Sequence, residues 1–543
     1  MPWRLRVRLS NDLGACQGRH YSATGVEPPS QISHHEAAGL PLDECKIMPA
    51  YQELETIFAR SAIVDDVIGL LGWDTETMMP PGAIEGRSEQ MSVLEDVSHE
   101  ALTSPATSDL LEAALEDQSE LSDWQKANLR EMRRAHIRAT AIPRDLLMAA
   151  SKANALCQHA WRGARKENDY GSVKEQLREV LRLQRETGAA VGEALGLGAY
   201  DALQDQFDPG ATGESTDRLF APVRAALPDL IQRALDRQAS APQAIAIDGP
   251  FARDRQERLC RLLLDRLSFD FDHGRLDVSA HPFTGGAFGD VRVTTRFTDD
   301  TILPSLLATI HEGGHALYEQ GRPSEWWKQP VGRSHGMAVH ESQSMIIELQ
   351  AGRNEHFLSY LLPLVRVEFE GKGAAWTDDN MRRVALRVSR GFIRVDSDEL
   401  TYPAHILVRY EIERAMIAGD LSVDDLPSAF NAAVEKYLGL KVLEDRDGCL
   451  QDIHWYGGAF GYFPAYLIGA MIASQLFEAA RVANPDIEPS LSKGEFGPLV
   501  SWLRGNIHSK GSLLGRDDLI AAATGSPPSA DQYLRHLERR YVG

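Results

Sequence analysis

The longest uniform stretch of this 543-residue chain runs from Met48 to about Leu267, and it reads as one helix after another. No run in it alternates between apolar and polar residues, as a half-buried strand would. Prolines and glycines interrupt the stretch, and each interruption predicts a break between two helices. These breaks are Met79-Pro80-Pro81-Gly82, Ser104-Pro105, Ile142-Pro143 and Asp208-Pro209-Gly210. The pattern predicts a mainly α-helical fold.

The periodicity changes once, between Leu276 and Phe297. Leu276–Ala280 and Val291–Phe297 alternate apolar with polar residues, and a glycine-rich segment, Thr284–Gly289, separates them. We predict that these two runs pair as a small antiparallel β-hairpin. After it helices resume, with breaks near Gly371-Lys372-Gly373, Gly419-Asp420 and Gly457-Gly458.

His311-Glu312-Gly313-Gly314-His315 follows this hairpin, in a stretch whose apolar residues recur every three or four positions. Asp299, Asp300 and Thr301 are expected to cap this helix, and Gly321 and Pro323 to end it. Histidines four residues apart lie one turn apart on one helix face, so both can bind one metal ion. Glu312 is placed to act as a general base toward water, whose pKa zinc lowers to about 7. The motif predicts a zinc-dependent hydrolase.

Gly313 and Gly314 are unusual inside a helix. Each glycine costs about 1 kcal/mol of helix stability relative to alanine. We therefore expect another backbone or a ligand to approach the helix closely at this point.

A catalytic zinc ion needs a third protein ligand. Gly336–Ser344 predicts a second helix about twenty residues beyond the first, and it contains His340 and Glu341 side by side. Consecutive helical residues point about 100° apart, so both cannot face the metal. Helix geometry alone leaves the choice between them open.

Charge and cysteine content exclude several classes of partner. The chain has 57 basic and 78 acidic residues, and its net charge of -21 argues against nucleic-acid binding. Its five cysteines are an odd number and scattered, without a CxxC pair. They are typical of reduced thiols in a cytoplasmic protein.

Two segments need a separate interpretation. Trp455–Phe477 has no charged residue, but its four glycines, Pro464, Ser474 and Gln475 favour a buried loop and core helix over a membrane span. Residues 1–47 lack apolar periodicity and have no signal-peptide core, so we expect a disordered extension or an over-long start.

Six short boxes occur in one order along the chain. They are His281-Pro282-Phe283, Asp290-Val291-Arg292-Val293-Thr294, His311–His315, His340-Glu341-Ser342-Gln343, Ile393–Asp398 and Gly448–Trp455. Together they resemble the carboxypeptidase Taq family of metallocarboxypeptidases, and Trp73–Pro80 is similar to the family as well. The resemblance covers Met48 to Gly543, with Ser397 where the family usually has alanine.

The resemblance implies a mostly helical body cut by a deep groove, with the β-hairpin next to the HExxH helix. Residues 48–543 would form one domain, in which 48–270 are a groove wall and 271–543 the catalytic part. His311, His315 and Glu341 would bind one Zn²⁺ per subunit, which Co²⁺ or Mn²⁺ can replace, and Glu312 would be the catalytic acid/base. The family removes single C-terminal residues with broad tolerance, acts poorly on C-terminal proline, and is homodimeric in many members.

A carboxypeptidase must also bind the free carboxylate of a peptide, and the planar fork of arginine suits this task. Arg394 is our first candidate and Arg292 the second; the alternative is a structural ion pair with Asp396, Asp398 or Asp290. The candidates for donating a hydrogen bond to the oxyanion are Tyr402, His405 and His454, and those for orienting other groups are Gln451 and Asp452.

Two alternatives remain. A zinc oligoendopeptidase, which cuts internally, would use the same HExxH motif with a distant glutamate. A zinc-stabilised scaffold without catalysis is less consistent with Glu312, because a structural site needs no base there.

Overall fold

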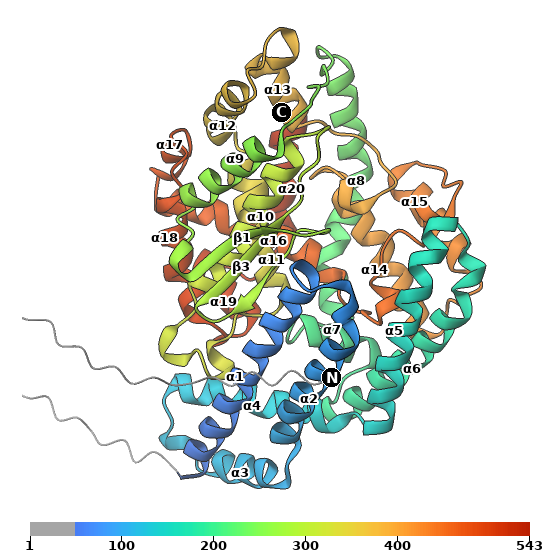
Figure 1. The fold of residues 1–543 in the computed structure, drawn as a ribbon, viewed down its shortest axis with the longest axis vertical. Coiled ribbons are helices and arrows are strands. Elements are labelled where there is room, and N and C mark those ends of the chain that lie inside the picture. Colours follow the sequence, from blue (N-terminus) through green and yellow to red (C-terminus); the bar gives the residue numbers. More distant parts are fainter. Residues whose placement is uncertain (1–48) are drawn as a thin grey trace, which may run out of the picture. The chain divides into compact units, whose positions relative to one another are not determined.

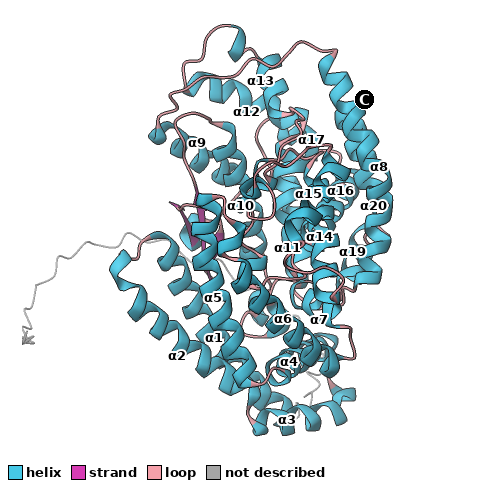
Figure 2. Cartoon of the chain, turned by 90° about the vertical axis from the view of Figure 1, so that its right-hand side faces the viewer, coloured by secondary structure: helices cyan, strands magenta, loops and turns pink. Residues whose placement is uncertain are grey.

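The computed structural model describes residues 49–543, so the expectation for residues 1–47 lies outside the described part. The described residues belong to one compact unit, Ile47–Gly543. They form twenty α-helices and one small three-stranded sheet (Figure 1). Helices account for nearly all regular structure in this unit (Figure 2), which confirms the predicted mainly α class.

All four predicted breaks separate helices among the first nine, but four further breaks, at 117–122, 168–173, 196–198 and 240–252, were not predicted. Each break has a local cause: Ser104, for example, accepts a hydrogen bond from Thr107 N at 3.2 Å, and Pro105 begins the next helix. The helices are α1 Pro49–Thr77, α2 Ile84–Thr103, α3 Pro105–Glu116, α4 Asp123–Ala141, α5 Arg144–Glu167, α6 Lys174–Leu195, α7 Ala199–Phe207, α8 Gly213–Ala239 and α9 Arg253–Arg266.

The sheet differs from the predicted hairpin. Its strands are β1 Gly274–Val278, β2 Thr284–Ala287 and β3 Asp290–Thr295, in the order β1-β3-β2. β1 pairs with β3 in parallel, with Leu276 opposite Val293, so the prediction that these runs form an antiparallel hairpin is wrong. The antiparallel partner of β3 is β2, from the segment interpreted as a connection. Alternation is the same in parallel and antiparallel strands, so it does not report direction.

The HExxH motif lies on α10, Leu303–Gln320, which packs against β3 and α9. The helix ends before Gly321 as predicted, but the predicted N-cap is wrong: the capping residue is Ile302, with no side-chain hydrogen bond. Pro304 in the first turn has no N–H, which removes one of the donors that a cap would satisfy.

The second predicted helix is α11, Met337–Met345, which continues directly into a π-helical segment, η7, Ile346–Gly352. Each of the three predicted glycine breaks lies between two of the later helices, whose other breaks were not predicted. The later helices are α12 Glu355–Glu368, α13 Asp378–Ala385, α14 Tyr402–Ala418, α15 Leu426–Leu438, α16 Pro464–Ala483, α17 Ile487–Leu491, α18 Gly497–Asn506, α19 Arg516–Thr524 and α20 Ala530–Leu537, the last followed by η13 Glu538–Val542.

Helix α16 lies in the main hydrophobic core and packs along α11. This contact is more extensive than that between any other two described elements. Nearly all side chains of its first four turns are buried, which agrees with the interpretation of Trp455–Phe477 as a loop and core helix. Within residues 49–543, no helix combines the length and the apolarity that crossing a membrane requires. α10, α11 and α16 lie together beside the sheet (Figure 1), and this is where the candidate site is found.

Candidate metal centre

α10 presents the two motif histidines to the same space. The rings of His311 and His315 lie 5.1 Å apart at an interplanar angle of 84°. The ring of His315 is more buried than that of His311, which keeps 23% of its side-chain surface exposed. The one-turn spacing of the motif therefore brings both imidazoles to one point, as the helical geometry predicts.

Glu341 of α11 completes a group of three ligand atoms. Its Oε1 lies 3.6 Å from Nε2 of His311, and its Oε2 lies 3.6 Å from Nε2 of His315. Among the described residues this is the only group of three or more such side chains whose ligand atoms all lie within 4.8 Å of one another. Two ligands about 2.1 Å from a tetrahedral ion are about 3.4 Å apart, so the two nitrogens and the carboxylate fit one zinc-like ion.

Two glycines allow the helices to come this close. A Cβ atom on Gly314 would lie 2.4 Å from Gln343 O and 2.6 Å from Ser344 Cα, both in the backbone of α11. On the other side of α11, a Cβ on Gly469 of α16 would lie 3.0 Å from Cβ of Glu341. The close backbone approach expected at Gly314 is therefore present, and it positions Glu341 opposite the histidines.

We expect Gly314→Ala to lower the free energy of unfolding by about 2–3 kcal/mol, because a new Cβ would push α11 away from α10. Gly313→Ala is the matched control: its Cβ would meet only the side-chain ends of Leu267 and Leu264, which can rotate. Both changes gain about 1 kcal/mol of helix propensity. Urea unfolding of the two variants measures the difference, and equal stabilities would contradict this account.

The outer nitrogen of His311 contacts Glu348 of η7. Nδ1 of His311 lies 3.0 Å from Oε2 of Glu348, whose Oε1 accepts from Arg353 at 3.1 Å. Burial alone would lower the pKa of His311, but this hydrogen bond and the charges of Glu341 and Glu312 raise it to about 10. Three carboxylates thus surround the ring, and such a position favours a cation.

The outer nitrogen of His315 begins a second chain of contacts. Its Nδ1 lies 2.7 Å from Nδ1 of His340, whose Nε2 lies 2.9 Å from Oε1 of Glu319. Burial would raise the pKa of Glu319, but the contact with His340 and the charge of Arg322 lower it to about 2, so Glu319 is an acceptor. If Nε2 of His315 keeps its lone pair for a metal, each remaining N–H in this chain donates to the next residue.

Glu312 lies beside the three ligand atoms and is 93% buried, with 7% of its surface exposed. Its Oε2 accepts a hydrogen bond of 2.8 Å from Oγ1 of Thr284, which is the first residue of β2. Burial raises the pKa of Glu312 above its ordinary value, and the charge of His311 opposes this shift. The small sheet therefore holds and orients the carboxylate of Glu312.

Arg394 is buried and forms an ion pair with Asp452. Its Nη2 and Nε donate to Asp452 Oδ1 at 2.8 and 3.1 Å, and Arg409 Nε donates to Oδ2 at 2.6 Å. The backbone N–H of Arg394 donates to Gln451, whose amide group donates to Phe392 O and Asp447 O at 3.0 Å each. Gln451 is thus engaged with backbone groups, and with Asp452 it fixes the position of Arg394.

Arg292, the second arginine candidate, lies on β3. It donates to Asp290 through Nε at 2.9 Å and Nη2 at 2.5 Å, and its guanidinium lies 4.5 Å from the ring centre of Trp73. These contacts are those of a structural ion pair with Asp290, which was the alternative interpretation for this residue.

The oxyanion candidates differ in access. His405 has no exposed surface, and burial lowers its pKa to about 3. His454 keeps part of its ring exposed, 5.5 Å from the ring of Tyr462, and burial lowers its pKa to about 4. Burial and the charge of Glu341 raise the pKa of Tyr402, although Arg394 opposes them, so its hydroxyl stays protonated and can donate.

Several residues of this region carry no signal that the sequence analysis used. Glu348 follows Glu341 by seven residues, two helical turns, and that spacing could have indicated it. Thr284 lies in a segment without chemical motifs. Tyr462 and Tyr466, whose rings are 5.2 Å apart, lie near Arg394 and Glu341 but resemble other aromatic residues of the buried stretch.

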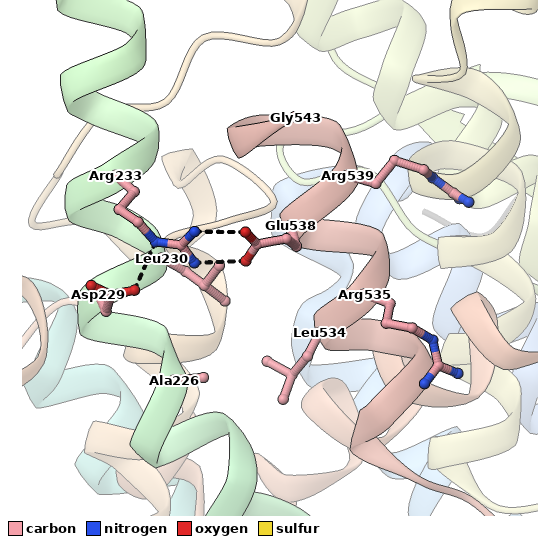
Figure 3. Close-up of a pocket in the computed structure, with 9 residues that line it drawn as sticks. All are labelled: Ala226, Asp229, Leu230, Arg233, Leu534, Arg535, Glu538, Arg539 and Gly543. Carbon is pink, nitrogen blue, oxygen red and sulfur yellow. Dashed lines mark hydrogen bonds and ion pairs between the residues drawn. The ribbon is translucent and has the colours of Figure 1, made fainter.

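A separate pocket of about 610 Å³ lies between α8 and α20 (Figure 3). None of the candidate site residues lines it. Its lining residues are Ala226, Asp229, Leu230, Arg233, Leu534, Arg535, Glu538, Arg539 and Gly543.

The chain matches known proteins over nearly all of its described length. A family model described as carboxypeptidase Taq (M32) metallopeptidase matches residues 53–541. This chain belongs to the carboxypeptidase Taq family. Thermostable carboxypeptidase 1 of Thermus thermophilus is 36% identical to it in a 504-residue alignment that covers 91% of this chain and 98% of that protein. Carboxypeptidase 1 of Bacillus subtilis is 32% identical, over 90% of this chain and 97% of that protein.

Solved structures of carboxypeptidase Taq relatives share the fold. Metallocarboxypeptidase 1 of Trypanosoma cruzi superposes with a TM-score of 0.89 at 39% identity, over 91% of this chain and 99% of that one. The M32 carboxypeptidase of Deinococcus radiodurans superposes with a TM-score of 0.86 at 35% identity, again over 91% of this chain and 99% of that one. The predicted family is confirmed. The protein is a metallocarboxypeptidase, its substrates are peptides, and its chemistry depends on a divalent metal.

Proposed function

We propose that this metallocarboxypeptidase is zinc-dependent and releases single residues from the free C-terminus of peptides, with Glu312 as general base. The observation that carries the proposal is the convergence of His311, His315 and Glu341 beside the buried carboxylate of Glu312. Two imidazoles and one carboxylate are a common ligand set of catalytic zinc, and they leave one coordination position open. Co²⁺ or Mn²⁺ can occupy the same set of ligands.

Glu312 is suited to transfer a proton. When bound, a zinc ion lowers the pKa of a water molecule to about 7 and polarises a carbonyl oxygen. Glu312 accepts the proton of the attacking water at Oε1, because Oε2 is held by Thr284, and passes it to the leaving amine. Burial raises the pKa of Glu312, which brings it closer to that of the groups between which it moves the proton.

Arg394 is our candidate for binding the C-terminal carboxylate. Asp452 accepts hydrogen bonds from Nε and Nη2 of Arg394, and Nη1 does not donate to this aspartate. Burial raises the pKa of Glu341 and the charge of Arg394 opposes this shift, so the two side chains lie within electrostatic reach. Tyr402 is our first candidate for the oxyanion donor, with His454 as the second. Arg292, Gln451 and His405 are better suited to supporting roles.

The proposed specificity is broad, with poor activity on C-terminal proline. This part rests on the likeness to the family. The proposal also includes a homodimer in the cytoplasm. Cys157, Cys260 and Cys449, the cysteines within the described residues, are free and buried, which is compatible with a reducing compartment.

Arg394→Ala tests the assignment against the endopeptidase alternative. We expect kcat/KM for a free-tailed peptide to fall about 10²-fold, because a buried charge-assisted contact is worth about 3 kcal/mol. Arg394→Lys keeps the charge without the planar fork, so its kcat/KM should lie between those of the wild-type protein and Arg394→Ala. Mass spectrometry of products from the free-tailed peptide and its C-terminally amidated twin gives the readout.

Arg387→Ala, which changes an exposed arginine a few residues upstream, is the matched control. The wild-type protein should shorten only the free-tailed peptide, one residue at a time. Equal internal cleavage of both peptides would instead support the oligoendopeptidase, and an unimpaired Arg394→Ala variant would remove Arg394 from the carboxylate site.

A further inference from the structure

A buried carboxylate, Glu399, joins the segment after Arg394 to the C-terminal segment of the chain. Its side chain has no exposed surface, and it follows Arg394 by five residues. Its Oε1 lies 2.7 Å from Nε2 of His536, and its Oε2 accepts from Nη1 of Arg540 at 2.7 Å and from the hydroxyl of Tyr541 at 2.8 Å. Burial opposes ionisation, but Arg540 and His536 hold the pKa of Glu399 well below its usual range.

Arg540 has a second set of partners at the end of η7. Its Nη1 donates to Leu349 O at 2.6 Å and its Nη2 to Gln350 O at 3.3 Å. The last carbonyls of any helical segment have no partner within it, and arginine side chains commonly satisfy them. Arg540 lies 190 positions from Gln350 in the chain, so this C-terminal cap of η7 comes from a distant segment.

The capped carbonyls are next to a residue of the metal centre. Leu349 directly follows Glu348, which contacts Nδ1 of His311 at 3.0 Å. π-helical segments are rare and occur frequently at functional sites. The position of the Glu348 carboxylate therefore depends on what holds the end of η7.

We propose that Arg540 is a positioning residue of the metal centre: it caps η7, holds Glu348 against His311, and so raises the affinity for the metal. The inference rests on the proposed ligand set of His311, His315 and Glu341. Outer partners of metal-bound histidines typically change metal affinity by about 10–100-fold when removed. Arg540 acts one contact further out.

The test is a competition titration of Zn²⁺ against a chromogenic chelator, with circular dichroism to verify folding. We expect Arg540→Ala to weaken Zn²⁺ binding about tenfold and Glu348→Ala about 10–100-fold. Because Arg540 acts through Glu348, the double variant should bind no more weakly than Glu348→Ala alone. Arg540→Lys has one nitrogen in place of Nη1 and Nη2, so it should lose the contact with Gln350 O and bind Zn²⁺ about threefold more weakly.

Arg539→Ala is the matched control. Arg539 is exposed on the same turn and points away from α8, whereas Glu538 beside it pairs with Arg233 (Figure 3). Its removal should leave Zn²⁺ affinity unchanged. If circular dichroism shows that Arg540→Ala has lost helical structure, the comparison of single and double variants is made with Arg540→Lys and Glu348→Ala.

The outcomes separate this inference from the proposed function. The role of Arg540 would be overturned if its substitution left Zn²⁺ affinity unchanged, or if the losses of affinity from the two single variants multiplied in the double variant. In either case Glu341→Ala should still abolish tight Zn²⁺ binding. Unchanged affinity in Glu341→Ala would instead overturn the ligand set itself.

Discussion

Glu312→Gln is expected to lower kcat by about 10³-fold or more while Zn²⁺ remains bound. The amide is nearly the same size as the carboxylate, but it cannot accept a proton from water, and general-base catalysis contributes about 10²–10⁴-fold. Thr284 can still donate to the amide oxygen, so the local geometry should persist. Steady-state kinetics on a free-tailed dipeptide or tripeptide, with metal content measured on the same sample, test this expectation.

Glu325→Gln is the control for the charge change. Glu325 is exposed in the connection between α10 and α11, so this variant should keep wild-type kinetics. A Glu312→Gln variant within tenfold of wild type would exclude Glu312 as the base. Loss of metal from that variant would place Glu312 among the ligands instead.

Glu341→Ala should lose Zn²⁺ far more completely than His340→Ala. If three protein ligands share a binding free energy of about 10–16 kcal/mol, removing one weakens binding on the order of 10³-fold. His340 contacts the outer nitrogen of His315 and not the space between the ligand atoms, so its removal should cost about 10–100-fold. Activity should fall in parallel with occupancy, and excess Zn²⁺ should restore it more readily in His340→Ala.

Comparing the variants of His340 and Glu341 tests which of these adjacent residues is the third ligand, a choice that helix geometry left open. Both variants are measured with the same chelator competition, so differences in method cancel. Weaker binding by His340→Ala than by Glu341→Ala would exchange their roles, with His340 as the ligand and Glu341 as its support.

Some helix ends were predictable from single residues. Ser104-Pro105 and Gly321 mark real boundaries, because proline and glycine change which backbone conformations are allowed, whatever lies nearby. The N-cap of α10 was not predictable in the same way. Asp299, Asp300 and Thr301 have suitable side chains, but the helix begins later at Leu303, and Asp299 O instead accepts from Phe251 N at 2.9 Å.

Strand pairing shows a different limit. The two predicted runs, Leu276–Ala280 and Val291–Phe297, overlap β1 and β3 in sequence. The predicted antiparallel direction of their pairing was wrong. β2 was missed because Thr284–Ala287 is short and contains two glycines, which weaken any strand signal. A strand with so little preference of its own depends on its neighbours, here β3 and α1.

The chemistry of the centre divides along the same line. The HExxH spacing placed His311, Glu312 and His315 together, because four residues are one turn of any α-helix. The sequence alone also determined the family, through six boxes in one order. The tertiary structure alone brought Glu341 to the Nε2 atoms of both histidines and His340 to the outer nitrogen of His315, paired Arg394 with Asp452, and placed Glu348 against His311 and Arg540 at the end of η7. Local periodicity reaches only a few turns along a chain, whereas these contacts join residues that only the packing of distant helices brings together.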